Sequence, residues 1–102
     1  MINQDQFREI YGNKSSSHCL LDVRTAYEFA DHHLPGSINI PIEELADRFK
    51  EISADLPVVT ICEHGVRSGI AEIFLKEQGY RADSLQNGLS RWNGPLQLQQ
   101  HP

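Results

Sequence analysis

Three apolar runs along the chain are typical of buried strands in a parallel sheet. The run CLLDV covers residues 19–23, and the stronger run PVVTIC covers residues 57–62. The run ADSLQNG, residues 82–88, is typical of a last strand followed by a turn. Segments with helical spacing separate these runs. The pattern therefore predicts strands that alternate with helices.

Two of the predicted helices lie between the first strand and the second. Thr25 and Glu28 match the capping box that opens a helix, and this short helix is expected to end near HHLPG. Pro41 is a residue that a first helical turn tolerates. Apolar residues follow it at helical spacing, which predicts that one face of this helix is core: Ile42, Leu45, Phe49 and Ile52.

The third predicted helix begins at about Ser68. Its expected apolar stripe consists of Ile70, Ile73 and Phe74, and Gly79 is a residue that ends a helix. The segment LSRWNG predicts a short closing helix that carries Trp92, which we interpret as a core residue rather than a substrate-stacking one. The tail PLQLQQHP predicts nothing specific.

Alternating strands and helices indicate βαβ units around a mostly parallel sheet, so we expect an α/β fold. A chain of 102 residues is long enough for one domain. No repeat, low-complexity tract or linker interrupts the pattern. We therefore expect a single domain over residues 1–102.

Charge and the N-terminal segment exclude several classes of function. The net charge of −5 and the lack of a basic run argue against nucleic acid as a partner. The segment MINQDQFREIYGN lacks the pattern of a signal peptide, and no apolar run approaches the roughly 20 residues that span a bilayer. We expect a cytoplasmic protein without a membrane partner, in which Cys19 and Cys62 are both reduced.

Cys62 lies where an α/β protein is expected to bind its ligand, at the carboxyl end of a strand. Residues 63–68 then have to curl so that successive backbone N–H groups point inward, backed by the positive end of the next helix. Gly65 supplies the positive φ that such a curl requires. Arg67 is the neighbouring cation. These features favour the thiolate form of a cysteine, which is the nucleophilic form.

Two segments resemble the hallmark segments of the rhodanese (thiosulfate sulfurtransferase) family in its single-domain form. They are CEHGVRS, residues 62–68, and LLDVRTAYEFADHHLPGSINIP, residues 20–41. The resemblance implies a three-layer sandwich with a central, mostly parallel sheet flanked by helices. It further implies Cys62 as the catalytic nucleophile and a substrate-binding loop of Glu63, His64, Gly65, Val66, Arg67 and Ser68. Asp22, Arg24 and Glu28 match positions that mostly support structure in the family.

The same resemblance implies a reaction without a metal or organic cofactor. The Cys62 thiolate takes the sulfane sulfur of thiosulfate or a persulfide, becomes a persulfide, and passes the sulfur to a thiol or to cyanide. The expected partners are small sulfur donors and acceptors or a persulfide-carrying protein, with the chain a monomer or weak dimer. Two departures from the family pattern, His32 and the pair Asn87-Gly88, bear on local backbone geometry rather than on the reaction class.

Two other functions are compatible with parts of the sequence. Cysteine phosphatases and arsenate reductases use a similar thiolate loop, but with one more residue between cysteine and arginine than the four found here. A tetrahedral oxyanion needs that wider ring. Rhodanese-like domains also occur as non-catalytic binding modules, although these commonly lose the cysteine, which this chain retains.

Several other polar residues have a structural interpretation beside a functional one. Cys19 opens a buried run and is expected to be inert core. His32 and His33 are expected to be loop and capping residues rather than metal ligands. His64 lies inside the loop, and its sequence position is equally compatible with a contact to substrate and with an exposed residue that has no role in the reaction. Because Glu63 can offset Arg67, we also expect thiosulfate, a dianion, to be a weaker donor than a persulfide.

Overall fold

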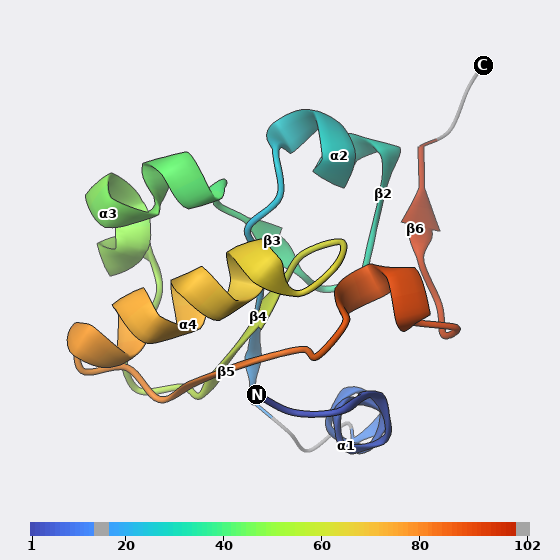
Figure 1. The fold of residues 1–102 in the computed structure, drawn as a ribbon, viewed down its shortest axis with the longest axis horizontal. Helices are drawn as coiled ribbons and strands as arrows, with labels where there is room; N and C mark the ends of the chain where they lie inside the picture. Colours follow the sequence, from blue (N-terminus) through green and yellow to red (C-terminus); the bar gives the residue numbers. More distant parts are fainter. Residues whose placement is uncertain (14–16, 100–102) are drawn as a thin grey trace.

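A parallel β-sheet forms the centre of the protein. The computed structural model describes residues 1–13 and 17–99, so the last three residues of the tail lie outside the described part. The sheet has four strands in the order β3-β1-β4-β5, and all three strand pairs are parallel (Figure 1). Its strands are β1 (Cys19–Asp22), β3 (Ile38–Asn39), β4 (Val58–Ile61) and β5 (Ala82–Ser84). The predicted α/β fold with its parallel sheet is confirmed.

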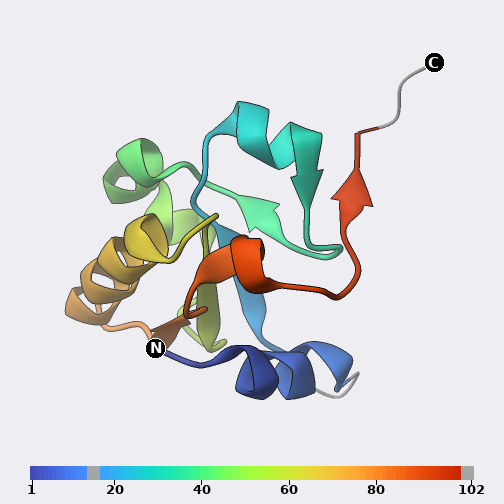
Figure 2. The same ribbon diagram turned by 45° about the vertical axis from the view of Figure 1, so that its right-hand side comes forward.

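Helical segments cover both faces of this sheet (Figure 2). On one face lie α4 (Val66–Glu77) and a segment made of η1 (Ile42–Glu44), α3 (Leu45–Arg48) and η2 (Phe49–Glu51). On the other face lie α1 (Gln4–Gly12) and η3 (Gly88–Arg91). Two apolar clusters fill the space between the layers. Because side chains alternate along a strand, neighbouring Val58 and Val59 belong to different clusters.

The cluster under α4 contains Leu21, Val23, Ile40, Leu45, Ile52, Val58, Cys62, Ala71, Leu75, Tyr80 and Ala82. The opposite cluster contains Phe7, Leu34, Val59, Ile61, Leu85, Leu89 and Trp92. Trp92 is therefore core, as predicted. The strand β4 is buried along its whole length, which agrees with its continuous apolar sequence.

Helix α2 (Ala26–Asp31) begins with the predicted capping box. The Thr25 hydroxyl accepts the Glu28 N–H, and the Glu28 carboxylate accepts the Thr25 N–H. The same arrangement opens α1, where Asn3 and Gln6 cap each other, although the sequence reasoning did not predict this helix. The pairing satisfies backbone N–H groups that the first turn of a helix leaves without partners.

Helix α4 begins at Val66, two residues before the predicted start, and its predicted core stripe is largely wrong. Its buried residues are Ser68, Ala71 and Leu75. Ile70 and Ile73 are 55% and 62% exposed. The small residues Ser68 and Ala71 face the sheet together with Leu75, whereas the β-branched residues lie on the outer face. The end of α4 is as predicted, since Gly79 has φ +90° and the Tyr80 N–H bonds back to the Leu75 carbonyl.

The predicted helix after Pro41 is broken into short pieces, two of which are 3₁₀ turns. Its core face is nevertheless present, because Leu45 and Ile52 are buried. A second difference concerns β2 (His32–His33), which pairs with β6 (Gln97–Leu98) in an antiparallel ribbon. The tail therefore takes part in a strand pairing that its sequence did not predict. Across residues 1–13 and 17–99, no helix is both long and apolar enough to cross a bilayer.

Candidate active site

Cys62 follows β4 directly, at the carboxyl end of the parallel sheet. A short loop then leads into α4, and Gly65 is the residue that precedes the helix. Gly65 has φ +98°, as the sequence predicted, and lies in the left-handed region that favours glycine. Cys62 is only 1% exposed. The thiol is therefore held inside the loop at the N-terminus of the helix, shielded from bulk solvent.

Backbone N–H groups of the loop point at the thiol. The N–H groups of Gly65 and Ser68 lie 3.0 Å and 3.3 Å from the Cys62 Sγ. The Ser68 hydroxyl lies 3.3 Å from the same sulfur, within hydrogen-bonding distance. Thr60 donates a 2.8 Å hydrogen bond to the Ser68 carbonyl, which ties the first turn of α4 to β4. Donors aimed at one sulfur atom from a helix N-terminus stabilise its anionic form.

The first turn of η3 supports the loop that carries Cys62. The N–H groups of Leu89 and Ser90 donate to the carbonyls of Cys62 and Glu63, both at 2.9 Å. This approach requires Gly88, because a Cβ there would lie 2.3 Å from the Cys62 carbonyl oxygen. Asn87 also has a positive φ, +66°, which asparagine tolerates better than most residues. The departure Asn87-Gly88 therefore retains the left-handed backbone needed here.

Arg67 and Glu28 form a bidentate ion pair beside the loop. The two terminal nitrogens of Arg67 donate to the two carboxylate oxygens of Glu28 at 2.6 Å and 3.0 Å. The hydrogen bonds from Arg67 lower the pKa of Glu28 to about 2. Glu28 in turn raises the pKa of Arg67, and the nearby charges of Cys62 and Asp22 act in the same direction. The structure thus pairs Arg67, which was predicted as part of the substrate-binding loop, with Glu28, which was predicted to support structure.

Arg24 and Asp22 form a second ion pair, which is fully buried. Arg24 contacts both carboxylate oxygens of Asp22 and also donates to the His32 carbonyl at 2.6 Å. Glu63, 27% exposed, lies 3.5 Å from both the Arg24 guanidinium and the His32 ring. The sequence suggested that Glu63 would offset Arg67. In the structure its partners are Arg24 and His32 instead. His32 itself has extended backbone, with φ −161°, so this departure from the family pattern needs no special conformation.

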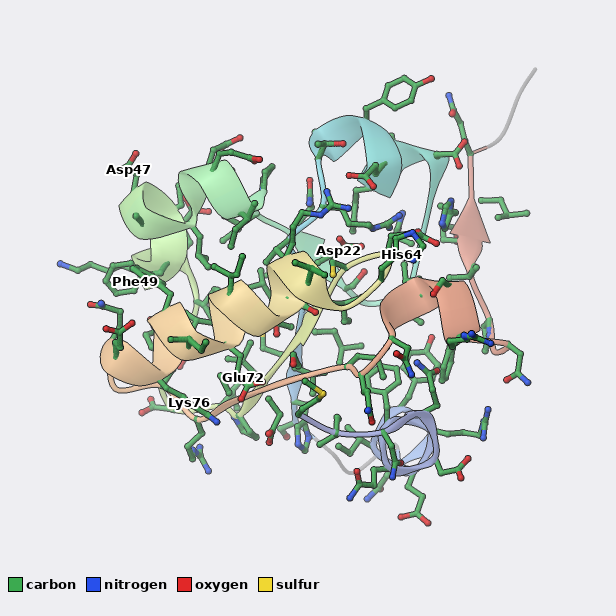
Figure 3. The ribbon with its side chains drawn as sticks, viewed as in Figure 1. Asp22, Asp47, Phe49, His64, Glu72 and Lys76 are labelled. Atoms are coloured by element: carbon green, nitrogen blue, oxygen red, sulfur yellow. The ribbon has the colours of Figure 1, made fainter. Side chains whose placement is uncertain are left out.

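The remaining candidate residues lie outside this cluster. His64 and Val66 are exposed on the loop and the first turn of α4, and Figure 3 shows His64 on the loop. Cys19 opens β1 and is half-buried, and burial raises the pKa of its thiol. In the described part of the chain, no group of three or more His, Cys, Asp or Glu side chains is placed to hold a metal ion.

The thiol, the loop and the two arginines are all candidates that the sequence singles out. The support given by Gly88, Leu89 and Ser90 was not predicted from the sequence, and neither was the contact between the Ser68 hydroxyl and the sulfur. The pair Asn87-Gly88 was the available signal for the first, because both residue types favour positive φ. No local pattern shows that this turn would lie against the backbone of Cys62.

Known proteins resemble this chain over most of its length. Residues 3–95 match the family model described as the rhodanese-like domain. The thiosulfate sulfurtransferase GlpE of Shewanella oneidensis is 35% identical over 75 residues, which cover 72% of this chain and 74% of that protein. The uncharacterized protein YqhL of Bacillus subtilis is 34% identical over 96 residues, which cover 93% of this chain and 73% of that protein.

A solved structure shows the same fold. The crystal structure of a rhodanese-related protein from Thermoplasma volcanium matches with a TM-score of 0.86 and 32% sequence identity. The match covers 95% of this chain and 96% of that one. The parallel sheet and its two helical layers are thus the fold of this structure as well. The chain belongs to the rhodanese-like domain family.

Proposed function

We propose that this protein is a sulfurtransferase that carries a sulfane sulfur as a persulfide on Cys62. The observation that supports this most directly is the pair of N–H groups, from Gly65 and Ser68, that point at the Cys62 Sγ. A thiolate in such a place is both a nucleophile and a stabilised anion. The persulfide made from it is also an anion and needs the same donors.

The proposed reaction has two steps. The Cys62 thiolate attacks the outer sulfur of a donor, a new S–S bond forms, and the donor's own S–S bond breaks. The leaving group, sulfite or a thiolate, departs with the bonding electron pair. A second thiolate or cyanide then attacks the outer sulfur of the persulfide and regenerates the Cys62 thiolate. Each step forms one bond to the transferred sulfur and breaks one S–S bond, so no external oxidant or reductant is needed. The covalent intermediate divides one transfer into two steps.

The other parts of the proposal follow from this chemistry. Only four residues separate Cys62 from Arg67, which suits one sulfur atom better than the three oxygens of a phosphoryl group. The reaction needs a reduced thiol, which suits the cytoplasm. We propose small sulfur donors and acceptors or a persulfide-carrying protein as partners, and one domain over residues 1–102 that acts as a monomer or weak dimer.

Intact-mass measurement tests the proposal. After incubation with a low-molecular-weight thiol persulfide or with thiosulfate, the protein should gain the mass of one sulfur atom. Cys62→Ser should abolish both this gain and the formation of thiocyanate from cyanide. Cys19→Ser is the matched control and should retain both. Failure of the parent protein to take up sulfur from any donor, or loss of uptake in a folded Cys19→Ser variant, would overturn the assignment.

A further inference from the structure

Arg24 and Arg67, the two arginines of the hallmark segments, are already neutralised by carboxylates. Arg24 is fully buried and held by Asp22, with hydrogen bonds of 2.8 Å to 3.1 Å. Arg67 is about one-third exposed, but the fork of its guanidinium is occupied by the two oxygens of Glu28. A cation in a bidentate pair offers a second anion little net attraction. Neither arginine is therefore available as an open anion site in this arrangement.

The carboxylates in this network outnumber the arginines. Glu63 lies within 3.5 Å of Arg24 and His32, and Asp31 lies 2.8 Å from the other ring nitrogen of His32. With Asp22 and Glu28, the ion pairs of Arg24, Arg67 and His32 thus contain four carboxylates and two arginines. A site with an excess of negative charge lowers the local concentration of dianions such as thiosulfate.

We infer that Glu28 is a positioning residue that selects the sulfur donor by charge, because it keeps Arg67 neutralised beside the loop. This inference rests on the proposed sulfurtransferase function and names its donor class: sulfane-sulfur donors with less negative charge than thiosulfate. The first step balances in the same way for each donor. The Cys62 thiolate bonds to the outer sulfur, and the leaving group takes the electron pair of the broken S–S bond.

Two donors that differ in charge make the inference testable. Methanethiosulfonate carries the same transferable sulfur as thiosulfate on a methylsulfonyl group, so it has one negative charge instead of two. The variant is Glu28→Gln, because glutamine keeps an oxygen for the Thr25 N–H and is the other residue found at this capping-box position. The substitution removes the carboxylate charge and leaves the charge of Arg67 uncompensated.

The expected result is a change in donor preference, measured as kcat/KM for each donor at low ionic strength. The parent should prefer methanethiosulfonate. Glu28→Gln should raise kcat/KM for thiosulfate by roughly tenfold or more, which is the lower end of the range for electrostatic steering. The value of kcat/KM for methanethiosulfonate, the monoanion, should change by less than about threefold. Salt supplies a second readout. Added salt should increase thiosulfate turnover in the parent, where it screens repulsion, and increase it less or lower it in the variant.

Glu51→Gln is the matched control. It also removes a carboxylate from an arginine pair, with Arg48, and Figure 3 shows the neighbouring Phe49 well away from His64 on the loop. It should leave the donor preference and its salt dependence unchanged. A parent that takes sulfur from both donors equally well, with no change in Glu28→Gln, would overturn the inference and leave the proposed function standing. A parent that takes sulfur from neither of these donors nor from a low-molecular-weight thiol persulfide would overturn the proposed function itself.

Discussion

Replacement of Gly88 by alanine should damage the candidate site without touching any of its side chains. The added Cβ would lie 2.3 Å from the Cys62 carbonyl oxygen and 2.6 Å from the Glu63 carbonyl oxygen. These atoms are backbone, so the clash cannot be relieved by rotating a side chain. Gly88 also has φ +63°, a conformation that costs an alanine about 1 to 2 kcal/mol.

The clash adds to this conformational cost. The turn and the loop have to separate, which breaks or lengthens the 2.9 Å hydrogen bonds from the N–H groups of Leu89 and Ser90. Each such bond contributes about 1 kcal/mol, and more when its groups stay buried and unpaired. The total is roughly 3 to 5 kcal/mol, a large fraction of the 5 to 15 kcal/mol that stabilises a typical domain.

Urea denaturation followed by the fluorescence of Trp92 measures this loss. Trp92 is the only tryptophan and directly follows η3. With a denaturant slope of about 1 to 2 kcal/mol/M, the midpoint should fall by about 1.5 M or more. Gly36→Ala is the matched control, since Gly36 has φ +87° but nothing within 4 Å of an added Cβ. It should lose only the conformational cost. Equal midpoints for the two variants would refute the reasoning.

Four further outcomes are expected. Because Arg67 lowers the pKa of Glu28 to about 2, their pair stabilises the folded state above pH 4.5 and this contribution is lost as the pH falls from 4.5 towards 2. Above pH 4.5 the parent should be more stable than Glu28→Gln by about 1 to 2 kcal/mol, after allowance for partial exposure. The difference in Tm between the two proteins should disappear as the pH falls from 4.5 towards 2; a constant difference would contradict the pairing. Ser68→Ala should slow alkylation of Cys62 at neutral pH by roughly tenfold, because the Ser68 hydroxyl, 3.3 Å from the sulfur, is the group that would donate to the deprotonated thiol; an unchanged rate would argue against that contact. Asn87→Gly should leave thermal stability nearly unchanged while Asn87→Ala lowers it by about 1 kcal/mol; equal losses would contradict the conformational argument. Hydrolysis of aryl phosphates should be negligible, and a rate that matches sulfur transfer would show that the ring-size argument is wrong.

Local patterns were sufficient to predict the elements that position the thiol. The apolar run before Cys62 indicated a buried strand, Gly65 indicated the left-handed turn, and Gly79 indicated the end of the helix. Thr25 and Glu28 indicated the start of α2. These signals work because each depends on the conformation of a few consecutive residues, and that conformation is limited by backbone sterics and nearby hydrogen bonds.

The orientation of α4 could not be predicted in the same way. Its apolar residues lie on more than one face, so the periodicity alone does not say which face meets the sheet. The structure buries Ala71 and Leu75 and exposes Ile70 and Ile73. The close approach of α4 to β4, where the Thr60 hydroxyl donates to the Ser68 carbonyl, determines which face of the helix meets the sheet. That choice depends on packing against another element, and close packing is a property of the whole core.

The charges around the thiol also depend on tertiary structure. The sequence by itself determined that a cysteine, a left-handed glycine and an arginine come together at the end of a strand, because they are close neighbours in the chain. It did not determine that Arg67 would be neutralised by Glu28, which lies 39 residues away. Nor did it determine that the turn at Gly88 would support the backbone of Cys62. Both contacts form only because α2, α4 and η3 pack around the same sheet and bring these distant segments together. The energy of an ion pair depends on the distance between the charges in space and not on their separation along the chain.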